Sequence, residues 1–218
     1  MDATVRADAL ATRERLVRGG IEPAELRARL LAVPALQRDP WLDLVLGIEG
    51  VPEDGVELPR GCVPYLPCSV DVLLRMIDAA GVSESDLFVD IGSGLGRALL
   101  LTHLLTRANA LGIEVQPQLV AGARALAARL KVSRCSIQQG DASALSGALA
   151  SGSVFFLYCP FAGPRLAALL DALEGVAGSR EIRICAADLP LPPRPWLTRL
   201  ELPWDDLAVY RSRGLVGQ

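Results

Sequence analysis

Three glycines after a short apolar run are the residues whose spacing most clearly indicates chemistry. The segment FVDIGSGLGRALLL places Gly92, Gly94 and Gly96 between a predicted strand that contains Asp90 and an apolar stretch that predicts a helix. Glycine lets the backbone turn sharply and approach a ligand closely, and the free amides at a helix N-terminus attract polar groups. The segment is therefore predicted to form a ligand-binding loop.

The spacing of these glycines distinguishes between the known nucleotide-binding loops. The dinucleotide fingerprint G-x-G-x-x-G requires a glycine at position 97, where this chain has Arg97. The phosphate loop G-x-x-x-x-G-K-[ST] requires a lysine beside the phosphates, and the only lysine of the chain is Lys131. Both patterns are therefore disfavoured, and a nicotinamide enzyme with a divergent loop is kept only as a minor alternative.

Two more carboxylates lie near the ends of the next predicted strands. Glu114 lies in the run 110–115 and has the oxygens to accept hydrogen bonds from both hydroxyls of a ribose. Asp141 follows the run 135–139. Because ligands of open α/β sheets bind outside the carboxyl ends of the strands, the glycine loop and both acids are expected at one site.

An acidic residue followed by G-x-G-x-G after the first strand resembles the first motif of the class I S-adenosylmethionine-dependent methyltransferases. The resemblance extends over about residues 60–212 and is strongest through Asp141. It implies S-adenosyl-L-methionine as the cofactor. In that family the loop surrounds the methionine and ribose part of the cofactor, which implies contacts from Asp90, Gly92, Ser93, Gly94 and Gly96.

The same resemblance implies cofactor contacts further along the chain. Glu114 would bind the ribose hydroxyls, and Asp141 would accept from the exocyclic amine of adenine while the backbone amide of Ala142 meets the ring. Tyr158, near the end of the fourth predicted strand, would lie beside the cofactor. Arg97, in the first turn of the predicted helix, can reach the cofactor carboxylate or instead pair with an acidic side chain.

The segment FFLYCPFAGP contains the residues expected to face the methyl acceptor. Many family members have Asn or Asp, then Pro, then an aromatic residue here, and the amide or carboxylate orients a substrate nitrogen. This chain has Cys159, Pro160 and Phe161, and a thiol is a weak acceptor. The departure argues against that type of N-methylation and leaves a second function open, a catalytically inactive cofactor-binding regulatory or scaffold protein. The ring of Phe161 can still pack on a cation, and closing the sheet edge is the alternative role of this segment.

The segment GCVPYLPCSVDVLLRMI resembles a subset of this superfamily that contains uncharacterised bacterial members and non-SET protein-lysine methyltransferases. In that subset the segment borders the cofactor. Tyr65 is therefore a candidate pocket wall or hydrogen-bond partner of the substrate, although Cys68 stands where Thr or Ser is usual; the alternative is a tyrosine packed under a linker. Ser69 is predicted to cap the N-terminus of a helix that runs through about Ala80, and Gly81 is predicted to end it. The acceptor is left open between a protein side chain and a small molecule.

Short apolar runs that alternate with helical segments predict the scaffold that positions these residues. Residues 87–91, 110–115, 135–139, 154–159 and 182–187 are predicted strands. Their alternation with helices is typical of a mainly parallel sheet covered on both faces, and two later runs indicate a C-terminal antiparallel hairpin. The predicted fold class is α/β, a Rossmann-like, doubly wound sheet of about seven strands.

The first part of the chain has a different pattern. Residues 8–46 show helical periodicity interrupted by Gly and Pro, including Pro40, and predict two or three short helices. Residues 50–67 are dense in Gly and Pro and predict an extended linker. The sequence thus predicts a helical appendage with its linker over 1–60 and a cofactor-binding domain over 61–218.

Composition limits the classes of partner. The chain has 218 residues, 51% of them hydrophobic, and a net charge of −3, so a nucleic-acid partner is disfavoured. No apolar run reaches the roughly 18 residues that span a bilayer, so no membrane partner is expected and the cytoplasm is the expected location. The sequence gives no indication of oligomeric state.

Histidine and cysteine usage limits the chemistry further. The only histidine is His103, whose helical setting favours a structural role, and so a catalytic triad or a His-Cys metal site would depend on that residue alone. The five cysteines are odd in number and form no C-x-x-C pair, so neither structural zinc nor a disulfide framework is predicted. Methyl transfer needs alignment more than a dedicated base, and the lack of histidine is no objection to it.

Overall fold

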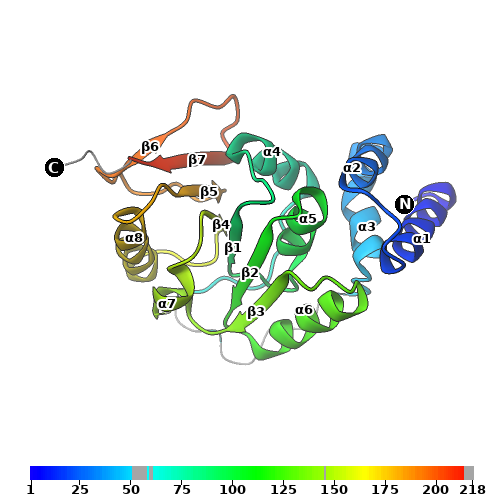
Figure 1. The fold of residues 1–218 in the computed structure, drawn as a ribbon, viewed down its shortest axis with the longest axis horizontal. Coiled ribbons are helices and arrows are strands. Elements are labelled where there is room, and N and C mark those ends of the chain that lie inside the picture. Colours follow the sequence, from blue (N-terminus) through cyan, green and yellow to red (C-terminus); the bar gives the residue numbers. More distant parts are fainter. Residues whose placement is uncertain (51–57, 59–60, 145, 214–218) are drawn as a thin grey trace.

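A seven-stranded mixed sheet forms the centre of the molecule (Figure 1). The computed structural model describes residues 1–50, 58, 61–144 and 146–213, so half of the predicted linker over 50–67 lies outside the described residues. The strand order is β3-β2-β1-β4-β5-β7-β6. The strands are β1 (Leu87–Ile91), β2 (Asn109–Glu114), β3 (Cys135–Gln139), β4 (Val154–Tyr158), β5 (Arg183–Ala187), β6 (Leu197–Arg199) and β7 (Leu207–Ser212).

The pairing of the strands confirms the predicted fold class. Strands β1 to β5 run parallel, and the chain reverses only at the end, where β7 pairs antiparallel with both β5 and β6. Buried positions run almost without interruption along β1 and β4. Such continuous apolar runs arise because both faces of a parallel sheet are covered, whereas a strand with one solvated face alternates.

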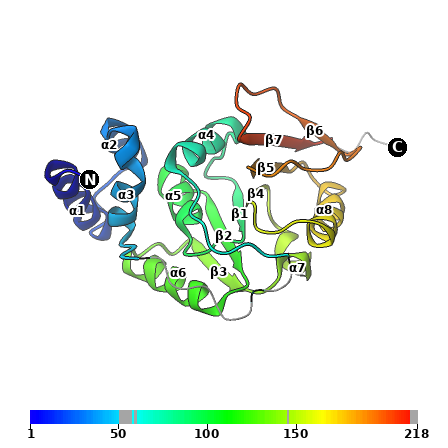
Figure 2. The ribbon, with the colours of Figure 1, turned by 180° about the vertical axis from the view of Figure 1, so that it is seen from behind.

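Helices cover the two faces of the sheet. On one face lie α4 (Val70–Ala80), α5 (Arg97–Thr106) and α6 (Pro117–Arg129), and on the other lie α8 (Pro164–Ala177) and the short α7 (Ser146–Leu149) (Figures 1 and 2). The predicted start and end of α4 are confirmed: the Ser69 side chain accepts from the Val72 amide at 3.3 Å, and Gly81 ends the helix with a φ of 61°. A short 3-10 helix, Ala142–Ala144, follows β3.

The first part of the chain forms three helices, α1 (Ala3–Val17), α2 (Pro23–Ala32) and α3 (Ala35–Leu46). Pro40 was expected to interrupt a helix, but α3 continues through it. A proline removes one backbone donor in a helix interior. The carbonyl left without this donor belongs to Leu36, which is 97% exposed, so water can replace the lost hydrogen bond.

The N-terminal helices form a third layer, in which α2 and α3 pack against α4 and α5, and α1 packs on α3 (Figure 1). Leu26 and Leu30 of α2 and Trp41 and Leu42 of α3 are fully buried in the same apolar cluster as Leu99 of α5. Burying one such side chain stabilises the fold by about 1.5–3 kcal/mol. The division into two domains at residue 60 therefore stays a prediction. One apolar core contains side chains from both sides of that boundary.

Candidate functional site

A pocket lies at the carboxyl edge of the sheet, beside the ends of β1, β2 and β4, and has a cavity volume of about 80 Å³. Loops that follow parallel strands meet at this edge, which is where open α/β sheets bind ligands. Several predicted site residues line it: Tyr65, Gly92, Glu114, Asp141, Ala142, Tyr158, Cys159, Pro160 and Phe161. The other predicted site residues lie in or beside the glycine loop and do not line the pocket themselves: Asp90, Ser93, Gly94, Gly96 and Arg97.

The conformation of the loop explains its glycines. Gly92, Gly94 and Gly96 have φ values of 77°, 53° and 78°, in a region where side chains are strained. A β-carbon on Gly92 would lie 2.7 Å from Cβ of Pro160, and one on Gly94 would overlap the ring of Tyr65. The loop therefore needs glycine both for its turn and for its contacts with the two segments that close the pocket.

Glu114 fixes the loop against the end of β2. One carboxylate oxygen accepts from the Gly94 amide at 2.9 Å and the other from the Gln116 amide at 2.8 Å. The amides of Gly92 and Ser93 donate to the carbonyl of Ile113 at 2.8 and 3.1 Å. Each carboxylate oxygen can accept a further hydrogen bond, so Glu114 holds the loop and can still bind ligand hydroxyls.

Asp90 lies under the loop and is 4% exposed. The pKa of its carboxyl is raised from 3.8 to about 7, mainly by burial and secondarily by the nearby charge of Glu114, while a hydrogen bond from the Leu99 amide opposes the shift. A carboxyl that is about half ionised at neutral pH becomes charged when a cation approaches. The site is thus suited to a positively charged ligand.

Asp141 occupies the far wall of the pocket, after β3. One carboxylate oxygen accepts from the amide and hydroxyl of Ser143 at 3.0 and 2.6 Å, and the other pairs with Arg165. Burial alone would raise the pKa of Asp141, but these hydrogen bonds and Arg165 lower it, so the group is charged. Arg165, in the first turn of α8, was not anticipated as a site residue, and only its position after the Cys-Pro-Phe segment could have suggested it.

Cys159 forms the opposite wall with an unusual backbone. Its φ is 43°, and Asp188, which follows β5, has a φ of 49°. The thiol donates to the carbonyl oxygen of Asp188 at 2.8 Å. Burial, and secondarily the charge of Asp188, raises the pKa of the thiol, so it is not a ready nucleophile. Asp188 was missed as a site residue, although it is an acid at a strand end like Asp90 and Glu114.

The segment before α4 closes the pocket from above, and Figure 2 shows it crossing in front of the sheet. The backbone of Cys62 pairs with that of Phe161 in an isolated antiparallel β-bridge, and the Val63 amide donates to the carbonyl of Pro160 at 3.3 Å. The Tyr65 ring covers Gly94, and burial raises the pKa of its hydroxyl to about 12, so it is a neutral group that can donate or accept.

Arg97 points away from the pocket lining. It is 4% exposed, and its guanidinium forms ion pairs with Asp39 at 2.6 Å and Asp43 at 2.9 Å, both on α3, and donates to the carbonyl of Cys68. Of its two expected roles, pairing with an acid is the one present in this structure. Through Arg97 the N-terminal helices are attached to the first turn after the glycine loop.

The described residues hold no cluster of three or more potential metal ligands, and all five cysteines are free. None of the helices in the described part of the chain is long and apolar enough to cross a membrane.

Comparison with known proteins agrees with this geometry. Residues 65–138 match the sequence profile of the family described as histone methylation protein DOT1. No curated protein matches the chain. The matched range contains the glycine loop and Glu114 and ends before Asp141 and the Cys159 segment.

Solved structures share the fold. An RNA methyltransferase from Salinibacter ruber, in complex with S-adenosyl-L-homocysteine, is 26% identical over 67% of this chain and 92% of that chain, with a TM-score of 0.51. The putative methyltransferase yhhF from Escherichia coli is 17% identical over 75% and 91%, with a TM-score of 0.55. The precorrin-6y C5,15-methyltransferase from Geobacter metallireducens GS-15 is 12% identical over 76% and 100%, with a TM-score of 0.51.

The fold, the profile match over residues 65–138 and the similarity to the RNA methyltransferase together support a Rossmann-like methyltransferase of class I. The cofactor of this class is S-adenosylmethionine, as the resemblance of the glycine loop implied.

Proposed function

We propose that this methyltransferase transfers the methyl group of S-adenosylmethionine to a nitrogen of a protein side chain. The observation that carries the proposal is the convergence of the glycine loop, Glu114 and Asp141 on one pocket at the carboxyl edge of the sheet. The similarity of residues 65–138 to a histone methylation family supports a protein acceptor.

The groups around the pocket fit this cofactor. Ile113, Leu119 and Ala142 supply apolar walls for a base, and the carboxylates of Glu114 and Asp141 supply acceptors for ribose hydroxyls and an exocyclic amine. Asp90 adds a negative charge near the loop when a cation binds. The cofactor itself would supply the methyl group on a positively charged sulfur.

The residues of the acceptor side would align a nitrogen and keep water away from it. The acceptor nitrogen gives its lone pair to the new N–CH₃ bond while the S–CH₃ bond breaks, and the proton of the amine leaves to solvent. Alignment of this displacement can account for much of the rate without a dedicated base. Phe161 can face the ammonium group that forms on methylation with its ring. Asp188, which contacts Cys159, offers acceptors beside it.

A protein acceptor also suits the surface around the pocket. Val63 and Leu66, on the segment that closes it, are 49% and 61% exposed. Exposed apolar side chains beside a pocket favour contact with a partner surface, and the net charge of −3 favours a basic partner over RNA.

Calorimetric titration with S-adenosylmethionine, S-adenosylhomocysteine and NAD tests the cofactor. We expect micromolar binding of the first two and none of NAD. Glu181→Gln is a matched control, since Glu181 is an exposed acid just before β5, at the amino edge of the sheet. Binding of NAD in preference to S-adenosylmethionine would contradict the proposal.

Transfer of a radiolabelled methyl group to lysine-containing peptides, basic proteins, small amines and RNA tests the acceptor. We expect label in protein side chains, located by mass spectrometry. Label confined to small amines or RNA would refute the acceptor class and leave the cofactor assignment intact. Tight cofactor binding with no transfer to any acceptor would favour the inactive, regulatory alternative.

A further inference from the structure

A second cavity, of about 420 Å³, lies between the N-terminal helices and the core. It is bounded by the turn after α1, the end of α5 and the turn between α6 and β3. Helix α5 begins at the glycine loop and ends at this cavity, so the cavity lies at the edge of the sheet opposite to the cofactor pocket. None of its lining residues belongs to the cofactor pocket.

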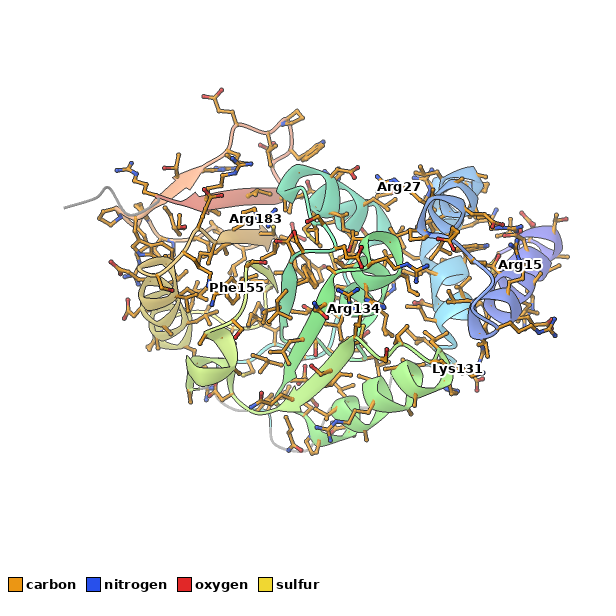
Figure 3. All side chains as sticks on the ribbon, in the orientation of Figure 1. Arg15, Arg27, Lys131, Arg134, Phe155 and Arg183 are labelled. Carbon is orange, nitrogen blue, oxygen red and sulfur yellow. The ribbon has the colours of Figure 1, made fainter. Side chains whose placement is uncertain are left out.

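Four cationic side chains line this cavity, and no acidic one does: Arg18, Arg107, Lys131 and Arg134. Figure 3 labels Lys131 and Arg134, which come from the turn between α6 and β3. The lining also contains His103, so the only lysine and the only histidine of the chain meet here.

Two of the cations occupy positions where glycine is expected. Arg107 ends α5 with a φ of 62°, and Lys131 follows α6 with a φ of 56°. The amides of Lys131 and Val132 donate to the carbonyls of Ala128 and Ala127, which is the hydrogen-bond pattern of a Schellman motif, usually built on glycine. Left-handed backbone at a residue with a side chain is strained, and such strain is found where a side chain has a function.

The cations are incompletely neutralised. Arg18 and Glu14 are 3.9 Å apart, and Arg107 and Glu22 are 3.6 Å apart, on largely exposed side chains. Such exposed pairs contribute little and exchange readily with a bound anion.

The two cations of the turn before β3 differ in their partners. Arg134 is held more firmly, by Glu84 at 2.8 Å. Within the described part of the chain, no acid lies within ion-pair distance of Lys131. Lys131 is therefore the cation most available to a ligand.

The remaining lining is mainly apolar, and its polar side chains are Ser133 and the buried imidazole of His103. Leu16, Ile21, Leu104 and Leu130 supply a hydrophobic surface. His103 is 5% exposed, and its Nδ1 lies 2.7 Å from the Ala108 carbonyl, so Nδ1 donates and Nε2 is left as an acceptor in the neutral ring.

We propose that this cavity binds an organic anion, with a phosphate or carboxylate head held by Lys131 and Arg107 and an apolar body against the leucines. The volume lies within the range of small-molecule sites, and Arg and Lys are the side chains that bind such heads. The site joins the N-terminal helices to the core and is separate from the site of methyl transfer.

Calorimetry with octyl phosphate, octanoate, adenosine monophosphate and inorganic phosphate tests the proposal, in the presence of saturating S-adenosylhomocysteine to exclude the cofactor pocket. We expect one site for an organic anion, bound at least about tenfold more tightly than inorganic phosphate. The alkyl and nucleotide probes distinguish the two kinds of apolar body. No binding below about 1 mM by any probe, or equal binding of inorganic phosphate, would overturn the proposal.

Variants separate ligand binding from folding. Lys131→Gly removes the charge but suits the left-handed backbone, so we expect a melting temperature no lower than that of the unsubstituted chain and a loss of affinity of about tenfold. Lys131→Arg should keep the affinity. Arg199→Ala removes an exposed cation of β6, at the far end of the sheet, and should have no effect. Unchanged affinity in Lys131→Gly, or an equal loss in Arg199→Ala, would refute the site.

Discussion

The two halves of the sheet differ in how closely they follow the pattern of their class. The half formed by β1, β2 and β3 carries the glycine loop and its acids, and the match to the DOT1 family profile ends within it, at residue 138. The half formed by β4 and β5 carries Cys159, at the position where the resemblance implies Asn or Asp, and Asp188; both have left-handed backbone. On the proposed function, cofactor binding would constrain the first half, and contact with the acceptor would constrain the second.

The largest expected effect concerns the attachment of the first half to the N-terminal helices. Arg97→Met should lower the free energy of unfolding by about 3 kcal/mol, because it removes the partner of Asp39 and Asp43 and a donor to the Cys68 carbonyl. Chemical denaturation measures this change. Arg194→Met, which removes the ion pair of the partly buried Arg194 with the exposed Asp171, is the control and should change stability by less than about 1 kcal/mol. Equal effects would show that the Arg97 cluster has no special role.

The next effect concerns the ribose side of the cofactor pocket. Glu114→Ala should weaken S-adenosylhomocysteine binding about thirtyfold, or about 2 kcal/mol, because the loop loses its anchor at the Gly94 amide and the ligand loses an acceptor. Calorimetry measures the affinity, and Glu181→Gln controls for the general loss of an acid. An unchanged affinity in Glu114→Ala would remove Glu114 from the site.

Asp90 should make both stability and cofactor binding depend on pH. Its pKa is raised from 3.8 to about 7, so the folded state holds the proton more tightly than the unfolded chain does. The contribution of this group to stability is full below pH 3.8, falls as pH rises, and is lost above about pH 7.

A cationic ligand prefers the ionised form of Asp90, so the affinity for S-adenosylmethionine should rise severalfold between about pH 6 and pH 8. Titration calorimetry across this range measures the rise, and Asp90→Asn should flatten the profile. A pH dependence that survives in Asp90→Asn would assign it to another group.

The smallest expected effect concerns the second half of the sheet. Cys159→Asn should change turnover or acceptor preference by about three- to tenfold while leaving cofactor affinity nearly intact, because Cys159 lines the pocket just after β4 and contacts Asp188 rather than the glycine loop. Steady-state kinetics with the identified acceptor measures the change. A loss of cofactor affinity of the same size would erase the distinction between the two halves.

Much of the scaffold was predictable because it is encoded within short segments. The runs 87–91 and 135–139 form strands with those bounds, and Ser69 and Gly81 delimit α4 as expected. Pro40 was misinterpreted because a proline costs a helix one hydrogen bond, and an exposed carbonyl can regain it from water.

The sequence by itself determined the elements, the glycine turn and the acids that follow the strands, since apolar periodicity and turn chemistry act between neighbours in the chain. Only the tertiary structure decided which charges meet. Arg97 pairs with Asp39 and Asp43, and Arg165 pairs with Asp141. Lys131 and His103 line the same second cavity. Residues so far apart along the chain have no local signal for pairing, because their distance is set by the packing of whole helices against the sheet.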